Sequence, residues 1–147
     1  MRILLATLMV LFALPVMAKE PGCEGAYDLH MKACALAVAT TEGKDLDTPA
    51  RQPEFKFAEK VCTDAANAAE DACLDGSAKR TYEPKNPKLI CQSYSYWVYD
   101  TIGAARSNLV KEKPDSPAGI VERSKQWQFI AKDAITNACE ENQGKEL

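Results

Sequence analysis

The residues of this chain whose types and spacing could do the most chemistry are its six cysteines. Thiols form disulfides, bind metals, attach haem and transfer electrons. All six cysteines follow residue 18, and no two of them are spaced as C-x-x-C, the motif of thiol redox catalysis. The haem-attachment motif C-x-x-C-H is absent as well. We therefore expect structural disulfides and no cofactor.

The spacing of the first four cysteines predicts how they pair. Cys23 and Cys34 are eleven residues apart, as are Cys62 and Cys73, and the indices 23 and 73 have the same sum as 34 and 62. Facing residues of an antiparallel helical hairpin have a constant index sum, so the pairs Cys23–Cys73 and Cys34–Cys62 share one register. Eleven helical residues span about 16 Å, whereas a disulfide needs Cα atoms within roughly 7 Å. Pairing within one helix is therefore excluded.

The remaining cysteines repeat the pattern, because Cys91 and Cys139 centre on Asp115 in the turn-like stretch 113–117. A parallel pairing of the first four would need a long return crossover, and the connection at 45–49 is too short to favour it. The nested geometry resembles that of the paired C-x9-C helical hairpins of the mitochondrial intermembrane space, although both spacings here are C-x10-C.

Four segments carry helical signals, at about 22–41, 53–74, 86–113 and 116–142. Asn86-Pro87 and Ser116-Pro117 each place a capping residue before a proline at the first helical position. No stretch has the sustained alternation of a strand. We predict an all-α, up-down four-helix bundle of two stapled hairpins, at about 21–76 and 86–142, joined by a surface loop at 77–86.

Other candidate catalytic residues are sparse. His30 is the single histidine and lacks partners for a metal site, so we expect it to pack in the hairpin seam against Ala66. No G-x-S-x-G motif surrounds any serine. The acidic pairs 70–71 and 140–141 are typical of solvated helix faces. We therefore expect no enzymatic activity and no metal site.

The most unusual local composition is the aromatic segment 94–99. A row of residues at helical spacing predicts a core stripe on the third helix: Tyr94, Trp97, Val98, Ile102, Ala105 and Leu109. A second side of the same helix gives a candidate interaction face around a small residue: Tyr96, Tyr99, Asp100, Gly103 and Arg106. The alternative is that this helix is central and buried on several sides. On the fourth helix the predicted core is Trp127, Ile130, Ala131, Ala134 and Ala138.

Residues 1–18 have the form of a secretory signal peptide, with Arg2, an apolar run and a small-residue cleavage site ending at Ala18. Residues 19–147 would then form a single domain with no stable membrane insertion after cleavage. Cysteines confined to the exported part fit an oxidising compartment, and the absence of an Asn-x-Ser/Thr sequon favours a bacterial periplasm. The net charge is −3 and no run of basic residues is present, so the sequence does not predict a positively charged surface that would bind nucleic acid.

These observations lead to three functional hypotheses. The first is a periplasmic or secreted binding protein, an inhibitor or immunity-type protein that acts through a protein partner in the cell envelope. The second is a small-molecule carrier with an apolar pocket between the hairpins, lined by Trp97, Ile102, Trp127 and Ile130. The third is a cell-envelope hydrolase that uses carboxylates.

Overall fold

The computed structural model describes residues 23–143, and all regular structure in that range is helical. The helices are α2 (Cys23–Glu42), α3 (Gln52–Leu74), α4 (Ser77–Tyr82), α5 (Ile90–Glu112), α6 (Ala118–Arg123) and α7 (Trp127–Gln143). Short 3-10 turns precede three of them, at Pro49–Arg51, Pro87–Leu89 and Ser124–Gln126. The predicted signal peptide lies outside the described residues.

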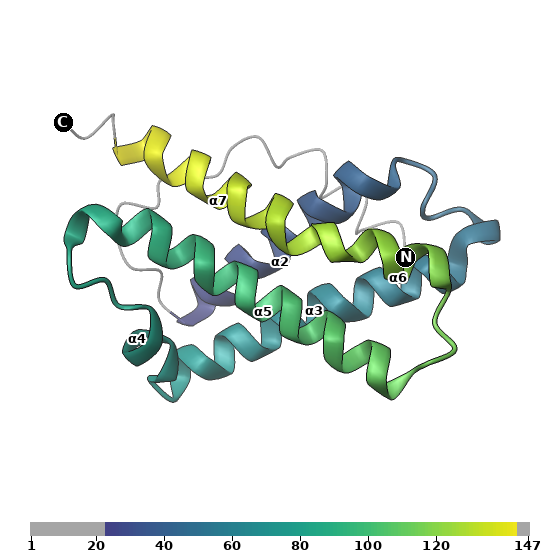
Figure 1. Cartoon of the computed structure of the whole chain (residues 1–147), viewed down its shortest axis with the longest axis horizontal. Helices are drawn as coiled ribbons and strands as arrows, with labels where there is room; N and C mark the ends of the chain where they lie inside the picture. Colours follow the sequence, from purple (N-terminus) through teal and green to yellow (C-terminus); the bar gives the residue numbers. More distant parts are fainter. Residues whose placement is uncertain (1–22, 144–147) are drawn as a thin grey trace.

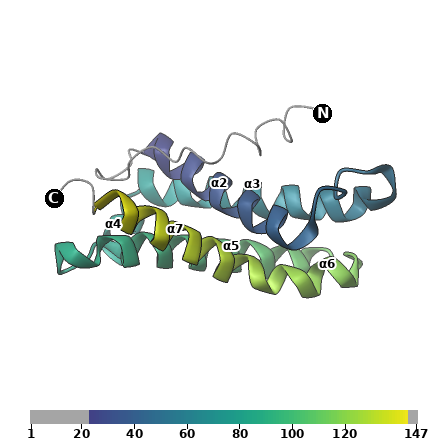
Figure 2. The ribbon, with the colours of Figure 1, turned by 90° about the horizontal axis from the view of Figure 1, so that it is seen from above.

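Four long helices form one up-down bundle (Figure 1). The hairpin of α2 and α3 makes one layer, and the hairpin of α5 and α7 makes the other (Figure 2). α3 packs on α5 and α7 packs on α2, so the layers meet along both of their helices. The two hairpins therefore share one core, and the predicted four-helix bundle is confirmed.

All three predicted disulfides are present. Cys23–Cys73 and Cys34–Cys62 join α2 to α3 across Cα distances of 5.3 and 5.4 Å. Cys91–Cys139 joins α5 to α7 across 5.5 Å. Because chain direction alternates around the bundle, Cys23–Cys73 and Cys91–Cys139 lie at the same end of the molecule.

Glycines in the left-handed conformation follow the first two helices. Gly43 has φ of +76° and donates its N–H to the Ala39 carbonyl, while Gly76 has φ of +75° and donates to Cys73. Glycine adopts this conformation at no steric cost and commonly ends a helix. The predicted ends of the first two helices are thus correct to within a residue.

The structure corrects two predicted features of the connections. The expected loop at 77–86 contains α4, which starts directly after Gly76. The fourth helical segment is interrupted by the 3-10 turn at 124–126, and it begins at Ala118 without a side-chain cap. Ser116 donates its hydroxyl back to the Lys113 carbonyl instead of capping, whereas Asn86 does accept from the Lys88 N–H as predicted.

The core is a continuous apolar cluster that draws on all four long helices. Every member of the core stripe predicted for α5 is buried. On α7 the prediction is partly wrong, because Ile130, Ala134 and Ala138 are only half-buried. The buried row of α7 is instead Trp127, Ala131, Ile135 and Cys139, at a spacing of four residues, which points one side of the helix at the bundle axis.

Candidate functional site

An exposed aromatic surface lies where α5 and α7 meet solvent. Tyr96 and Phe129 are 44% and 47% exposed, which is high for large rings. The Tyr99 ring packs edge-to-face on Phe129 with a centroid separation of 5.1 Å, and Lys132 Nζ lies 4.9 Å from the centre of the Tyr96 ring. We call Tyr96, Tyr99, Phe129 and Lys132 the aromatic face. Disulfide Cys91–Cys139 ties its two helices together.

Two other predicted interaction residues lie further along α5. A Cβ at Gly103 would come within 2.6 Å of Gln128 Oε1, so the space beside this glycine is occupied by a side chain of α7. The small residue at the centre of the predicted face is therefore covered by Gln128. Arg106 is half-buried, and its Nε is buried with no hydrogen-bond partner among the described residues.

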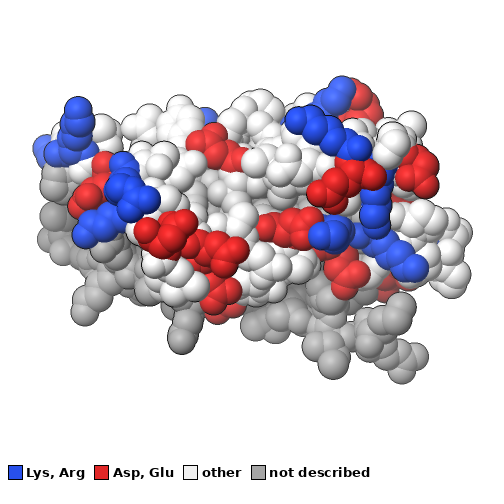
Figure 3. Space-filling view, turned by 90° about the horizontal axis from the view of Figure 1, so that it is seen from below, with Lys and Arg blue, Asp and Glu red and all other residues white. Residues whose placement is uncertain are grey.

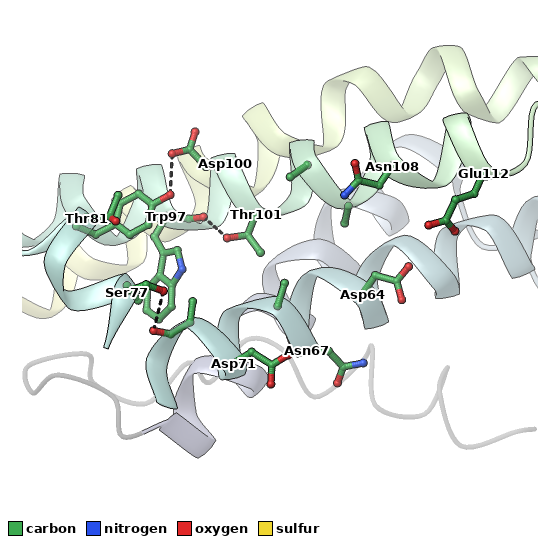
Figure 4. A pocket seen from close by; sticks show the side chains of 16 residues that line it. Asp64, Asn67, Asp71, Ser77, Thr81, Trp97, Asp100, Thr101, Asn108 and Glu112 are labelled. Carbon is green, nitrogen blue, oxygen red and sulfur yellow. Dashed lines mark hydrogen bonds between the residues drawn. The ribbon is translucent and has the colours of Figure 1, made fainter. Parts of the chain in front are cut away.

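Asp100 lies at the edge of a different surface. Its carboxylate accepts a hydrogen bond of 2.8 Å from the Tyr82 hydroxyl, and it lines a groove between α3, α4 and α5 together with Trp97 (Figure 4). Burial and this carboxylate raise the pKa of the Tyr82 phenol. The predicted face thus divides, with Tyr96 and Tyr99 toward α7 and Asp100 toward α4.

A charged cluster that the sequence analysis did not single out lies at the end of the bundle opposite to Cys91–Cys139. The Glu42 side chain is fully buried and accepts from Arg51 at 2.7 Å and from Arg123 Nε at 3.0 Å. Glu54 also bonds both arginines, at 2.9 and 2.6 Å. Arg51, followed by Arg123, holds the pKa of Glu54 below its usual range. These four residues, the charged cluster, join the two hairpins.

The same end holds the second tryptophan. Trp127 is fully buried, and its indole N–H donates to Thr41 Oγ1 at 2.7 Å. Thr41 Oγ1 in turn lies 3.4 Å from Glu42 Oε1. This network could not be predicted from the sequence, because Glu42 and Arg123 are 81 residues apart and no local pattern links them.

His30 is fully buried, as expected, whereas its predicted packing against Ala66 stays a prediction. Nδ1 lies 2.8 Å from the Ala26 carbonyl, and the ring meets Trp97 edge-on at 4.7 Å. Burial lowers the pKa of His30 to about 4, although the carbonyls of Ala26 and Trp97 oppose that shift. The imidazole is therefore neutral at physiological pH.

The residues named for an apolar carrier pocket lie mostly in the shared core. Ile102 and Trp127 are fully buried there, and Ile130 packs against it. Among the acidic pairs, Asp71, Glu140 and Glu141 are exposed. Within residues 23–143, no three histidine, cysteine or acidic side chains are grouped so that they could hold a metal ion.

One face of the molecule shows acidic side chains along its middle and basic side chains toward its two ends (Figure 3). None of the described helices is long and apolar enough to cross a membrane. In comparisons with protein-family models, curated proteins and solved structures, nothing matches the chain.

Proposed function

We propose that this chain is an exported, non-enzymatic binding protein that acts by docking a protein partner on its aromatic face. In a bacterial periplasm, such a protein would be an inhibitor or immunity-type protein that blocks an enzyme attacking the cell envelope. Export is supported by the form of residues 1–18 and by three disulfides, which persist in oxidising compartments.

The observation that carries this proposal is the exposure of Tyr96 and Phe129 on the two helices of a hairpin closed by a disulfide. Aromatic side chains are enriched at binding hot spots, where they bury a large area with little loss of conformational entropy. The contacts with Tyr99 and Lys132 hold both rings in place before any partner arrives. Such preorganisation lowers the cost of binding.

The test is co-purification of the oxidised protein from its native cell envelope, followed by mass spectrometry and by affinity measurement with the partner found. Tyr96→Ala and Phe129→Ala should each weaken binding by about thirtyfold, the effect of a typical hot spot. Because both rings are half-exposed, the free energy of unfolding should change by less than about 1 kcal/mol.

The matched control is Leu74→Ala, since Leu74 is 69% exposed but lies at the end of α3, away from the aromatic face. It should leave the affinity unchanged. Equal losses from Leu74→Ala and Tyr96→Ala would contradict the proposal, as would a large loss of stability from either aromatic substitution without an effect on binding.

A further inference from the structure

The groove between α3, α4 and α5 lies on a different side of α5 from the aromatic face. Its volume is about 620 Å³, and it opens to solvent (Figure 4). α3 contributes Asp64, Asn67 and Asp71, α4 contributes Ser77 and Thr81, and α5 contributes residues from Trp97 to Glu112. The small side chains of alanines at 68 and 72 on α3, and at 104 and 105 on α5, leave space between these two helices.

All charged side chains that line the groove are acidic. Four carboxylates line it, and no lysine, arginine or histidine does. Lys60 neutralises Asp64 from outside the groove, and Asp100 accepts from Tyr82. Asp71 and Glu112 have no cationic partner among the described side chains. A ligand with positive charges is therefore favoured, and an anionic one is repelled.

The indole of Trp97 also lines the groove. This residue is only 6% exposed, and its N–H, which is not among the fully enclosed unpaired atoms, reaches solvent in the groove with no hydrogen-bond acceptor from the described part of the chain. Tyr82 stacks on the ring with a centroid separation of 5.9 Å, which fixes its orientation. Figure 4 shows the ring between α5 and the helices opposite, with its nitrogen toward the open space of the groove. A carbonyl of a bound ligand can take the place of the water that this N–H meets in the groove.

The carboxylates and the indole donor together favour one chemical class of ligand. Metal ions and polyamines carry positive charge but offer no acceptor to an indole N–H. A basic peptide offers both, because its side chains carry ammonium or guanidinium groups and its backbone carbonyls accept. From Trp97 to Glu112 the α5 wall is about 22 Å long, which matches roughly six or seven residues of extended chain. We propose that the acidic groove binds an extended lysine- or arginine-rich peptide segment of another protein, with a backbone carbonyl on Trp97.

The experiment uses the fact that the chain has two tryptophans. Each gives one indole N–H signal in a proton–nitrogen correlation spectrum, and the Trp127 signal, already bonded to Thr41, is an internal reference. The disulfide-bonded protein is titrated at low salt with a hexapeptide of alternating lysine and glycine, blocked at both ends. The Trp97 signal should move downfield on saturation, while the Trp127 signal stays in place.

The same peptide with acetylated lysines tests the role of charge, and spermine tests the role of the carbonyl. Neither should move the Trp97 signal as the lysine peptide does. An equal movement with the acetylated peptide would overturn the charge argument. An equal movement with spermine would overturn the assignment to a peptide, and no movement with the lysine peptide would overturn the site itself.

Variants locate the site. The double variant Asp71→Asn with Glu112→Gln changes two exposed side chains that have no cationic partner. It should lower the affinity for the lysine peptide by about fivefold or more. The control pair Asp133→Asn and Glu140→Gln makes the same charge change on exposed positions of α7 and should have little effect. Equal losses in the two double variants would mean nonspecific attraction and would overturn the proposal. Trp97→Phe, which removes the N–H and keeps a ring, should abolish the preference for peptide over spermine.

Peptide binding in the groove does not require the aromatic face. Tyr96→Ala should leave peptide binding in the groove unchanged, since Tyr96 is not among the residues that line it. Failure of the groove and failure of the aromatic face are therefore separate results.

Discussion

The buried imidazole of His30 binds protons differently in the folded and in the unfolded chain. In the folded chain its pKa is lowered to about 4 from the usual 6.5, because burial disfavours the charged ring. The unfolded chain therefore binds a proton between these two values that the folded chain does not. The contribution of His30 to the free energy of unfolding is therefore fully present above pH 6.5, and it is lost as the pH falls toward 4.

We predict that the melting temperature falls over this interval by an amount that corresponds to roughly 3 kcal/mol at most. His30→Gln removes the titrating ring and should flatten the curve between pH 6.5 and 4. Glu54, whose pKa is lowered in the folded chain, contributes mainly below pH 4.5, so the two proteins are compared between pH 6.5 and 4.5. Calorimetry of both proteins across this range checks the prediction, and parallel curves would refute it.

Gly103 is a second residue whose role can be isolated. An alanine there would meet only the far end of Gln128, which is a flexible side chain. Alanine also favours the helix over glycine by up to about 1 kcal/mol. Gly103→Ala should therefore leave the free energy of unfolding unchanged or raise it slightly, as measured by urea denaturation. A loss of more than about 1 kcal/mol would mean that Gln128 is locked in place.

Among single residues, the sequence predicted best the positions that regular helix geometry determines. The disulfide pairs could be predicted because helical rise and a constant index sum leave one register for the antiparallel hairpin. The neighbours of Tyr99 and Gly103 could not, because Phe129 and Gln128 approach from another helix. The partner of Asp100 could not be predicted for the same reason, since Tyr82 belongs to a helix that was expected to be a loop.

At the scale of the elements, the charged cluster links helical segments through ion pairs, as the disulfides link helices through covalent bonds. Glu42 ends α2, Arg51 ends the 3-10 turn before α3, and Arg123 ends α6, so one buried carboxylate of α2 bonds arginines from two other segments. A buried charge without its partners is costly, whereas a fully paired one is close to neutral. The cluster therefore acts mainly as a constraint on how the hairpins meet.

Glu42→Gln should destabilise the protein by about 2 to 3 kcal/mol, at the low end for buried ion pairs because both arginines are partly exposed. The control is Glu122→Gln, which breaks an exposed pair with Lys125 and should cost about 0.5 kcal/mol or less. Chemical denaturation measures both. Similar values for the two variants would show that the cluster contributes no more than an ordinary surface pair.

Short elements were the least predictable. α4 has six residues, too few for a helix to be stable on its own, and it depends on packing against α3 and α5. The 3-10 turn before α7 likewise has no signal in residues 124–126 themselves. Trp127, which must reach Thr41, follows this turn directly. Tertiary contacts decide both features.

Across the whole molecule, the order of the cysteines complicates oxidation. The native pairs of the first hairpin are nested, so the earliest cysteines to emerge, Cys23 and Cys34, are not partners. We predict that the reduced protein recovers its native bridges faster with a disulfide isomerase than without one. Mass mapping of bridges during refolding checks this.

The control variant Cys23→Ser with Cys73→Ser leaves two pairs that are consecutive in sequence, Cys34–Cys62 and Cys91–Cys139. Its oxidation should be much less sensitive to the isomerase. If the natural protein refolded equally fast with and without the enzyme, nesting would not be an obstacle.

The two ends of the bundle are held by different chemistry. Cys23–Cys73 and Cys91–Cys139 close the end near α4, while the charged cluster joins the hairpins at the other end. Every bridge lies within one hairpin, and the hairpins are linked by the chain at 75–89 and by noncovalent contacts. Two molecules that exchanged hairpins through this segment would keep all six cysteines with their own partners. Such a swapped dimer would run as a monomer on a non-reducing denaturing gel, and native size measurements would be needed to detect it.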